Sequence, residues 1–547
     1  MADAVLPPGS LAQPSQGQPS QGQPSQALGA DGSYVNWTRV FLGFGGMIIG
    51  QFMAMLDIQI VASSLTQIQS GISASADEIA WVQTIYLLAE VVIMPLTAYL
   101  TKMWGTRSFY VIAVIGFTVT SAAVGLSSSV PVMIGFRALQ GLFAGAMIPP
   151  VFATAMTIFP PERRLTANVT VGLIVTLAST IGPTLGGHIT DLLNWRWLFF
   201  INIPVGALVI FLVGRYANFD RGDPNLAKGI DWLGLGLMSV FLLAMQYVLE
   251  EGSGDGWFDD PAILWLSVTA ALAGAAFIWR QLTYWQPIVS LKPFADRNFA
   301  LGVSMVFVTG VSLFGGTFLM PIYLGRIRGF SSSEVGTTML VTGLAMFLSA
   351  PLAGRFVRIV DARIAMVGGF ALSAWAIQLA VQITDQWGFA EFFVLQAARG
   401  LGTMVAMVAA QQLSVATLPV YLMKDASGLI NLIRNVAGAM GLAMLSTILS
   451  HQNAVHFMEL TSAASTANPT SSAMMEGLTQ MMSASGLSDP DGVARKAMSG
   501  LIHRQAAVLS FGDAFAAVAM FCWLAAFLGL FGRPGSAMAR ADDVRGH

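Results

Sequence analysis

Long apolar runs separated by short polar segments dominate this chain. A helix needs about 20 mostly apolar residues to cross the hydrocarbon core of a membrane. Fourteen stretches reach that length, at roughly 39–64, 79–101, 108–127, 131–155, 166–190, 197–216, 231–250, 260–280, 299–324, 334–355, 364–384, 389–413, 427–450 and 509–532. The pattern therefore predicts an all-α integral membrane protein with fourteen transmembrane helices.

The basic residues indicate how these spans are oriented. Loops on the cytoplasmic side of a membrane carry an excess of Lys and Arg. With a cytoplasmic N-terminus, 18 of the 27 basic residues fall in cytoplasmic loops or tails and six fall outside. The remaining three, Arg137, Arg399 and Arg434, lie within spans. We therefore expect both termini in the cytoplasm, which requires an even number of spans.

A short internal repeat suggests that the chain has two related halves. The segment Pro95–Arg107 ends the second span and reads PLTAYLTKMWGTR, whereas Pro351–Arg363 ends the tenth and reads PLAGRFVRIVDAR. Arg137 in span four and Arg399 in span twelve repeat the relation, each followed by glycine and small residues. One short match can arise by chance, but parallel halves around a midplane site are typical of transporters. We expect two six-helix halves with an inserted two-helix hairpin.

Segments outside the spans complete the predicted organisation. Pro14–Gln26 repeats PSQGQ without aliphatic residues, which is typical of a disordered tail. A long outside loop at 451–508 contains six Met, and both a solvated, partly helical loop and a docking surface for a partner stay open. The expected regions are a cytoplasmic tail (1–36), the N-terminal half (37–217), the hairpin with its linkers (218–298), the C-terminal half (299–533) and a second cytoplasmic tail (534–547).

Composition narrows the class of protein further. Only 10% of residues are charged and 55% are hydrophobic, whereas soluble proteins carry about 25% charge. The net charge of −2 argues against nucleic acid as a partner. The single cysteine, Cys522, cannot form an intramolecular disulfide. The N-terminus lacks a basic region followed by an apolar core, so we expect no cleavable signal peptide.

Two acids within the apolar runs are the strongest clue to mechanism. Glu90 lies in the middle of the stretch Trp81–Leu100, and Asp57 lies near the end of the stretch before it. A carboxylate in a membrane span costs about 2.5–3.5 kcal/mol, so such groups usually face a bundle interior and serve a function. The pattern favours proton-coupled transport.

The two acids are expected to differ in role. At 1.5 Å per residue, Asp57 and Arg137 both lie about 10–15 Å below the outer boundary and can pair. Such a pair would act as a gate or charge relay, and a purely structural ion pair is the alternative. Glu90 has no cation near it in sequence, so desolvation favours its protonated form. We expect Glu90 to carry the proton; a hydrogen-bonded packing residue is the alternative.

Small residues punctuate the fifth span. Gly172 is followed by a cluster that allows close helix approach and removes one backbone hydrogen bond. Ordinary packing explains the last two glycines alone, but the full cluster is more specific. Its members are Gly182, Pro183, Gly186 and Gly187.

Motifs of enzymes and cofactor-dependent proteins are missing from the sequence. It has no Gly-rich phosphate loop ending in Gly-Lys-Ser/Thr, no Gly-x-Ser-x-Gly elbow and no histidines at metal-ligand spacing. We therefore expect no metal, no cofactor and no ATP-driven step within this chain, and no enzyme. A membrane enzyme or receptor would need a convergent catalytic set or a soluble signalling domain.

Taken in order, the motifs from about residue 37 to 533 resemble the major facilitator superfamily, specifically the fourteen-span drug/proton antiporters of the EmrB/QacA type. The resembling segments are Leu56-Asp57 with Ile60-Val61, Arg137-Ala138-Leu139-Gln140-Gly141, Gly172 with Gly182–Gly187, Trp195-Arg196-Trp197, Phe200–Pro204, Pro321–Leu324, Gln505-Ala506-Ala507 and Asp513-Ala514-Phe515. The resemblance implies proton-coupled export, with Arg137 linked to proton coupling and the fifth-span cluster characteristic of exporters.

The loop between spans two and three departs from the usual family pattern. Lys102 occupies a region where an acidic residue is usual, and Ala98 replaces a glycine, while Gly105 and Arg107 follow. A basic residue there is seen in EmrB-like members, so we expect this gating loop to work differently in the subgroup. Gly325 stands where the family usually has a polar residue, which removes support for a role there.

The resemblance also implies a setting and partners. We expect a proton-driven multidrug exporter of amphipathic or lipophilic toxic compounds in a bacterial inner membrane, in contact with lipid and a small-molecule substrate. An EmrA-like periplasmic adaptor and an outer-membrane channel would assist it. The alternative is a dedicated exporter of one endogenous metabolite, such as a siderophore, fatty acid or antibiotic.

Overall fold

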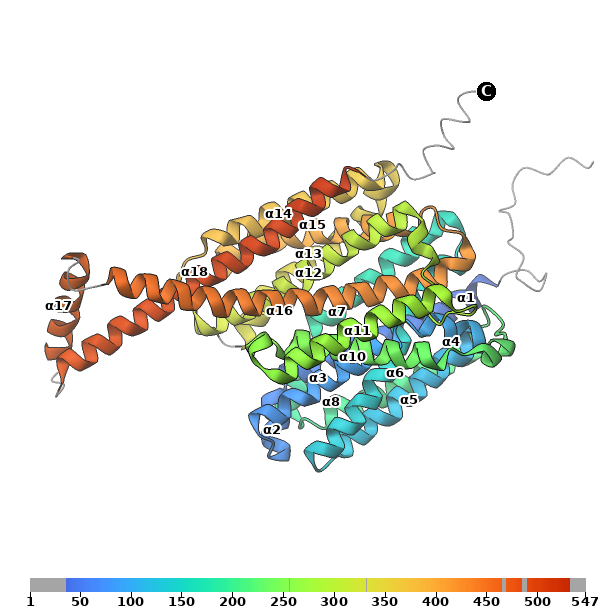
Figure 1. The fold of residues 1–547 in the computed structure, drawn as a ribbon, viewed down its shortest axis with the longest axis horizontal. Helices are drawn as coiled ribbons and strands as arrows, with labels where there is room; N and C mark the ends of the chain where they lie inside the picture. Colours follow the sequence, from blue (N-terminus) through green and yellow to red (C-terminus); the bar gives the residue numbers. More distant parts are fainter. Residues whose placement is uncertain (1–35, 255, 331, 465–468, 485–488, 532–547) are drawn as a thin grey trace, which may run out of the picture.

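A computed structural model describes residues 36–254, 256–330, 332–464, 469–484 and 489–531 of the chain, and these form a bundle of helices (Figure 1). Twelve helices in this described part are long and apolar enough to cross a membrane, and the bent pair α3–α4 makes a thirteenth. The predicted span 166–190 lies in α7, a 32-residue helix that is not among these thirteen. The all-α membrane fold is therefore confirmed, while the count of fourteen spans stays a prediction.

The helices before residue 217 pack mainly on one another, and we call them the N-terminal half. α3 packs on α6, α1 on α7 and α9, and α5 on α6 and α9. The bounds are α1 (Trp37–Ser63), α2 (Leu65–Ile72), α3 (Ala76–Ile93), α4 (Thr97–Trp104), α5 (Thr106–Leu126), α6 (Val130–Ile158), α7 (Pro161–Leu192), α8 (Trp197–Phe200) and α9 (Asn202–Tyr216).

The helices after residue 296 form a second packed group, the C-terminal half. α14 packs on α15 and α18, α13 on α15, and α12 on α15, α16 and α18. The bounds are α12 (Arg297–Arg326), α13 (Ser332–Ile359), α14 (Ala362–Leu379), η4 (Ala380–Gln382), α15 (Phe389–Val415), η5 (Val420–Leu422), α16 (Met423–Ala463), α17 (Pro469–Ala484) and α18 (Pro490–Gly529).

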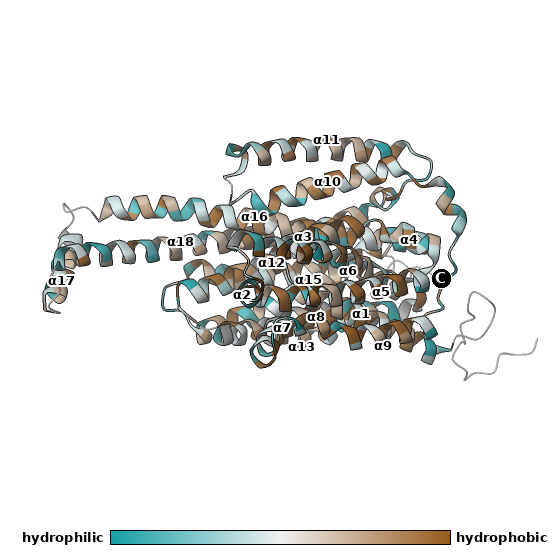
Figure 2. Cartoon of the chain, turned by 90° about the horizontal axis from the view of Figure 1, so that it is seen from below, coloured by the Kyte–Doolittle hydropathy of each residue, from teal (hydrophilic) through white to brown (hydrophobic). Residues whose placement is uncertain are grey.

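A helical hairpin connects the two halves along the chain. It comprises α10 (Trp232–Glu251) and α11 (Pro261–Thr283), with short 3₁₀ turns η1 (Pro224–Gly229), η2 (Trp257–Asp259) and η3 (Lys292–Ala295) around it. α10 packs on α3 and on α16, and the hairpin lies along one side of the bundle (Figure 2). It therefore covers a seam where the two halves meet.

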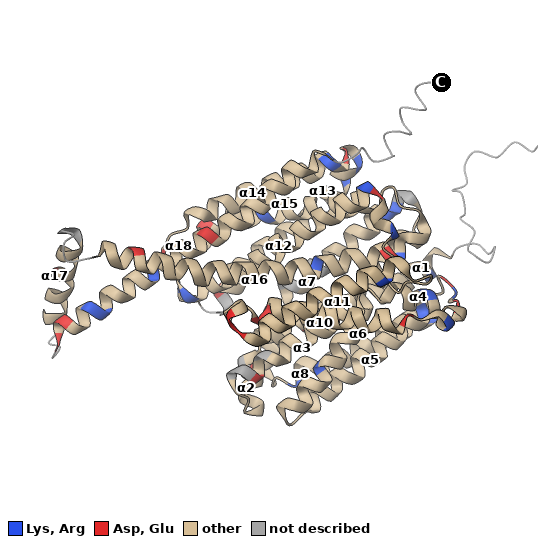
Figure 3. Cartoon of the chain, viewed as in Figure 1, with Lys and Arg blue, Asp and Glu red and all other residues tan. Residues whose placement is uncertain are grey.

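The two ends of the bundle differ in charge. We call the end where α1 begins and α18 ends the basic end, because Lys and Arg side chains gather there (Figure 3). Aspartates cap some of the helices that start at this end: Asp231 accepts from Gly234 N at 2.9 Å and Asp296 accepts from Phe299 N at 2.9 Å. Such caps satisfy backbone donors that a helix start leaves unpaired.

The segment 451–508, predicted as a loop that is partly helical or a docking surface, is mostly helical in its described residues. α16 continues without a break to Ala463, α18 already begins at Pro490, and α17 lies across their tips (Figure 1). We call the part of α16 beyond residue 450, α17 and the part of α18 before residue 509 the projection. The segment is rich in Ala, Met and other good helix formers, which explains why the flanking spans extend into it.

Two glycines allow α6 to pack closely against α3 at the position of Glu90. A Cβ atom on Gly141 would collide with the carbonyl oxygen of Tyr86, and one on Gly145 would collide with that of Glu90. Because backbone atoms cannot move aside as a flexible side chain can, only glycine fits at these positions. The contact places Glu90 and the functional face of α6 side by side.

This contact yields a stability prediction. We expect Gly145→Ala to lower the free energy of unfolding by about 1–3 kcal/mol, because the added methyl group overpacks a helix–helix contact. Gly135→Ala on the same helix is the matched control, since a Cβ there meets no atom within 4 Å. Thermal unfolding of the purified proteins in detergent measures the difference, and equal stability of the two variants would refute the packing argument.

Candidate functional site

A buried carboxylate lies at the centre of a polar network in the N-terminal half. Asp57 on α1 is fully buried, and its Oδ2 accepts a hydrogen bond from Arg137 Nη1 of α6 at 2.7 Å. Its Oδ1 accepts from Gln140 Nε2 at 3.1 Å and from Asn202 Nδ2 of α9 at 2.9 Å. The network thus ties three helices together through one charged group. The pairing that the sequence allows for Asp57 and Arg137 is present.

Arg137 is held by more than its ion pair. Its Nε donates to the carbonyl oxygen of Val82 at 3.1 Å, and its guanidinium carbon lies 4.1 Å from the centre of the Tyr86 ring. Cation–π contacts of this kind gain strength when water is excluded. Its Nη2 is buried and makes no hydrogen bond to any described residue. One donor of the guanidinium is therefore available for a further contact.

Glu90 lies where the two halves meet. Its side chain is buried, and Oε1 accepts from Asn435 Nδ2 of α16 at 3.3 Å. Oε2 is buried with no hydrogen-bond partner among the described residues. An ionised carboxylate with an unsatisfied buried oxygen is costly, so the geometry suits a carboxyl that holds a proton.

Glu90 and the ion pair belong to one helix contact. Tyr86 and Glu90 lie four residues apart on the same face of α3, and Arg137 lies over the Tyr86 ring. Gly141 and Gly145 press α6 onto the backbone of the same two residues. A shift of α3 at Glu90 would therefore move the tyrosine on which Arg137 rests.

The predicted cluster of the fifth span divides between two contacts. A Cβ on Gly186 would lie 2.6 Å from Ser63 Oγ, and Gly182 packs against Gln59, so both hold α7 against α1 close to Asp57. Gly187 meets nothing within 4 Å, and the side chain of Pro183 lies outside the described part of the structure. Gly172 faces the other half, since its Cβ would lie 2.9 Å from Met407 Cε.

A small cavity lies between the halves. Its wall includes Gln51 and Gly172 from the N-terminal half, and Gln411, Asn431 and Arg434 from the C-terminal half. Its volume of about 20 Å³ is little more than one water molecule needs. The halves are therefore closed around the centre in this structure, and a larger ligand needs them to separate.

Ion pairs join the halves at the basic end. Lys102 Nζ of α4 contacts both carboxylate oxygens of Asp425 on α16, at 2.6 and 2.8 Å. The preceding residue, Lys424, pairs with Asp220, which follows α9. Asp220 also accepts from Thr106 N at 2.8 Å and so caps α5. Two neighbouring residues of the C-terminal half thus pair with opposite charges on α4 and on the linker that follows α9.

The other residues of the predicted gating loop support this pair from the side. Gly105 has φ +78°, a backbone conformation that side chains with a Cβ rarely adopt, and it turns the chain from α4 into α5. Asp223 N donates to the carbonyl oxygen of Lys102 at 2.9 Å. Arg107 is exposed and forms no ion pair with a described residue. Its predicted part in gating stays a prediction.

The structure adds polar partners that sequence reasoning did not single out. Asn202 and Gln140 both lie in segments that resemble family motifs. Neither motif indicated a contact with Asp57. Asn435, Asp425 and Asp220 pair with residues between 114 and 345 positions away in sequence. Such long-range partners carry no periodic signal, so only the fold reveals them.

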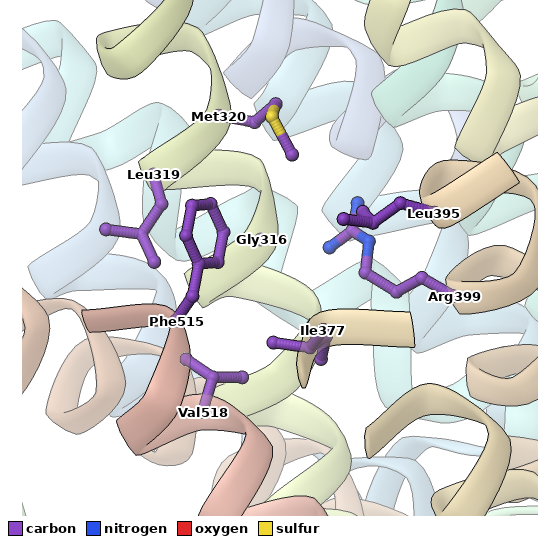
Figure 4. A pocket seen from close by; sticks show the side chains of 8 residues that line it. All are labelled: Gly316, Leu319, Met320, Ile377, Leu395, Arg399, Phe515 and Val518. Atoms are coloured by element: carbon purple, nitrogen blue, oxygen red, sulfur yellow. The ribbon is translucent and has the colours of Figure 1, made fainter. Parts of the chain in front are cut away.

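The C-terminal half repeats the buried arginine without its acid. Arg399 Nε donates to Gln396 Oε1 at 3.2 Å and its Nη2 donates to Thr342 Oγ1 at 3.2 Å. A Cβ on Gly316 of α12 would collide with the guanidinium, so this glycine makes room for it (Figure 4). No described carboxylate lies within ion-pair distance of Arg399. The repeat therefore keeps the buried arginine, but its partners are neutral polar side chains and not a carboxylate.

The repeated loop of the C-terminal half has its own local ion pair. Asp361 caps α14 and contacts the Arg363 guanidinium at 3.0 Å. The hydrogen bond from Arg363 holds the pKa of the Asp361 carboxyl below its usual value. Arg107 of the first loop has no comparable partner among the described residues.

Two packed groups of membrane-spanning helices, a closed cavity between them and buried ionisable groups beside it define a membrane transporter of the two-half type. The chain belongs to the Major Facilitator Superfamily, whose model matches residues 47–442. The same fold occurs in the human organic anion transporter MFSD10, with a TM-score of 0.58 at 12% identity over 90% of this chain and 99% of that one.

Bacterial relatives confirm the predicted resemblance to EmrB-like exporters. The chain is 34% identical to the colistin resistance protein EmrB of Acinetobacter baumannii, over 89% of this chain and 95% of the relative. It is 29% identical to the multidrug export protein EmrB of Escherichia coli, over 79% and 85%. It is 28% identical to the fatty acid resistance protein FarB of Neisseria gonorrhoeae, over 78% and 83%.

The buried ion pair yields a second prediction. We expect Asp57→Asn to lower the free energy of unfolding by about 3–5 kcal/mol, because it leaves the Arg137 guanidinium buried without a counter-charge. Asp361→Asn is the control: asparagine caps a helix as well as aspartate does, and a partly exposed pair contributes less than about 1 kcal/mol. Denaturant titration of both purified variants measures this, and similar losses would contradict it.

Proposed function

We propose that this protein is a proton-driven antiporter that exports amphipathic or lipophilic toxic compounds. The observation that carries the proposal is Glu90, a buried carboxyl at the junction of the halves with one oxygen that has no described partner. Such a group can exchange a proton when the halves separate and water reaches it. The multidrug export and resistance proteins among the relatives support this class of substrate.

Orientation follows from the charge distribution. The basic end would face the cytoplasm of a bacterium, because loops rich in Lys and Arg stay on that side of the inner membrane. α1 begins and α18 ends at the basic end, which supports cytoplasmic N- and C-termini. The projection would then extend into the periplasm.

The closed ion pairs suggest where the protein stands in its transport cycle. Lys102–Asp425 and Lys424–Asp220 would seal the cytoplasmic end, so the structure is a form closed to the cytoplasm. Each proton that moves inward releases about 2.3 kcal/mol per 100 mV of membrane potential. Glu90 would bind a proton and a cationic substrate in competition.

Coupling would run through α3. Loss or gain of a proton at Glu90 changes its bond to Asn435 of the other half, and Tyr86 on the same face supports Arg137. The Asp57–Arg137 pair would transmit that change to α1 and α6. Gly182 and Gly186, which pack α7 on α1, would let those helices slide together.

A dedicated exporter of one endogenous metabolite is the alternative. One relative is named for fatty acid resistance, which supports a fatty acid over a siderophore or antibiotic within this alternative. A susceptibility panel in a pump-deficient host separates the two functions. Protection against many unrelated compounds supports the multidrug exporter, whereas protection against one compound supports the dedicated exporter.

The third prediction concerns proton coupling. We expect Glu90→Gln to reduce pH-gradient-dependent export at least tenfold without loss of expression, because glutamine keeps the bond to Asn435 but cannot release a proton. Dye transport into everted vesicles at imposed pH gradients measures it. Unchanged export would remove Glu90 from the mechanism.

Glu78→Gln is the matched control for this experiment. Glu78 begins the same helix, is exposed, and accepts from Ser75 N at 2.9 Å in a capping box that glutamine also supports. The Ser75 backbone N–H holds the pKa of the Glu78 carboxyl below its usual value, so this residue stays ionised through the neutral range. Export by this variant should match the wild type.

A periplasmic adaptor of the EmrA type, linked to an outer-membrane channel, would dock on the projection. Exposed methionines on its surface, Met458, Met474 and Met481, suit adaptable apolar contacts. The projection is built by two long spans and so is rigidly joined to the transport core.

The fourth prediction tests this partner. Replacing α17 by a short Gly-Ser linker should leave folding intact, because α17 contacts mainly the tip of α18. Resistance that depends on a co-expressed adaptor should fall to the level seen without the adaptor. If adaptor-dependent resistance is unchanged, the adaptor docks elsewhere.

A further inference from the structure

Arg434 of α16 is a partly buried cation that the proposed transport cycle leaves without a role. Its Nη1 donates to Asn431 Oδ1 at 3.4 Å, a long bond within its own helix. Its Nε and Nη2 are buried and make no hydrogen bond to any described residue. Donors of a charged group that are buried without partners are unfavourable, so a ligand that supplied acceptors would stabilise them.

The two buried arginines of the described chain have fixed polar partners. Arg137 has the Asp57 carboxylate, and Arg399 has Gln396 and Thr342. Arg434 has no carboxylate within ion-pair distance among the described residues, although Glu90 is bonded to the very next residue, Asn435. Arg434 therefore has no counter-charge among the described residues, and an anionic ligand could supply one.

The surroundings of Arg434 fit a ligand with two different ends. Arg434 lines the cavity between the halves together with the polar side chains Gln51, Gln411 and Asn431. Apolar groups of Phe152, Val171, Leu313 and Met407 complete the wall. A charged head can lie against the first group while a hydrocarbon chain lies against the second.

The backbone holds Arg434 in place. A Cβ on Gly310 of α12 would lie 2.8 Å from the carbonyl oxygen of Arg434, so the two helices touch at this residue. Its neighbour Asn435 donates to Glu90 across the junction of the halves. The backbone at Arg434 is therefore held against α12, and at the next residue against α3.

We infer that Arg434 binds the carboxylate head of acidic amphiphiles and selects them over cationic ones. A guanidinium presents paired N–H donors that match the two oxygens of a carboxylate. The closed cavity is too small for such a ligand, so binding belongs to a state in which the halves have separated. This inference rests on the proposed export function and names one class of substrate for the same site.

The fifth prediction compares two compounds with the same twelve-carbon tail, laurate and dodecyltrimethylammonium. We expect Arg434→Gln to lower kcat/KM for laurate export in everted vesicles at least tenfold, mainly through KM, because the carboxylate loses its charged donors. Export of dodecyltrimethylammonium should stay within twofold of wild type. Arg434→Lys keeps the positive charge but loses the paired N–H donors of the guanidinium. Its kcat/KM for laurate should lie between those of wild type and Arg434→Gln.

Arg326→Gln is the matched control, since Arg326 is exposed at the far end of α12 and loses the same charge. Equal losses for both compounds in the Arg434 variants, or no loss for either, would overturn the inference. If Arg434→Gln does not elute as a single species in detergent, the Arg434→Lys variant decides by the same comparison.

Failure of the underlying function gives a different result. If wild type and Glu90→Gln export both compounds equally poorly, the antiporter proposal fails. Laurate binding to purified wild type and Arg434→Lys protein, followed by tryptophan fluorescence, then decides the inference alone. Tighter binding to wild type supports it, and equal binding refutes it.

Discussion

The Asp57–Arg137 ion pair is the constraint on which the N-terminal half depends. Two full charges buried within a membrane protein are tolerated only if their remaining donors and acceptors are satisfied. Gln140, Asn202, Val82 and the Tyr86 ring supply most of these contacts, and they come from three helices, α3, α6 and α9. Any relative movement of these helices must therefore keep the ion pair intact or exchange its partners.

The two halves share an architecture but differ in electrostatics. The N-terminal half neutralises its buried arginine with a carboxylate, whereas the C-terminal half places a glycine against Arg399 and leaves Arg434 facing the cavity. Glu90, the buried acid bonded to Asn435 across the junction, belongs to the N-terminal half. If Glu90 carries the proton as we propose, proton exchange would take place on the N-terminal side of the junction and Arg434 would supply positive charge on the C-terminal side.

Sequence patterning predicted the membrane fold, the resemblance of the two halves and the pairing of Asp57 with Arg137, because each depends on apolar runs, charge rarity and helix rise. It left 451–508 as a loop that is partly helical, and did not indicate that α16 and α18 extend unbroken from the neighbouring spans into it. It also missed Asn435 and Asp425. Their roles depend on the contact between halves, and residues that meet across such a contact share no spacing that a single chain displays.

Because α16 is continuous, movement at the centre of the protein would be transmitted to the projection. The helix runs unbroken from Asp425 at one gate, past Asn435 at the centre, to Ala463 at the tip. From Asn435 to the tip is about 40 Å at the rise of an α-helix. A tilt of about 10° at the centre would therefore displace the tip by about 7 Å. The same rod that opens the cavity would act as a lever, so a protein bound at its tip would sense each transport step as motion.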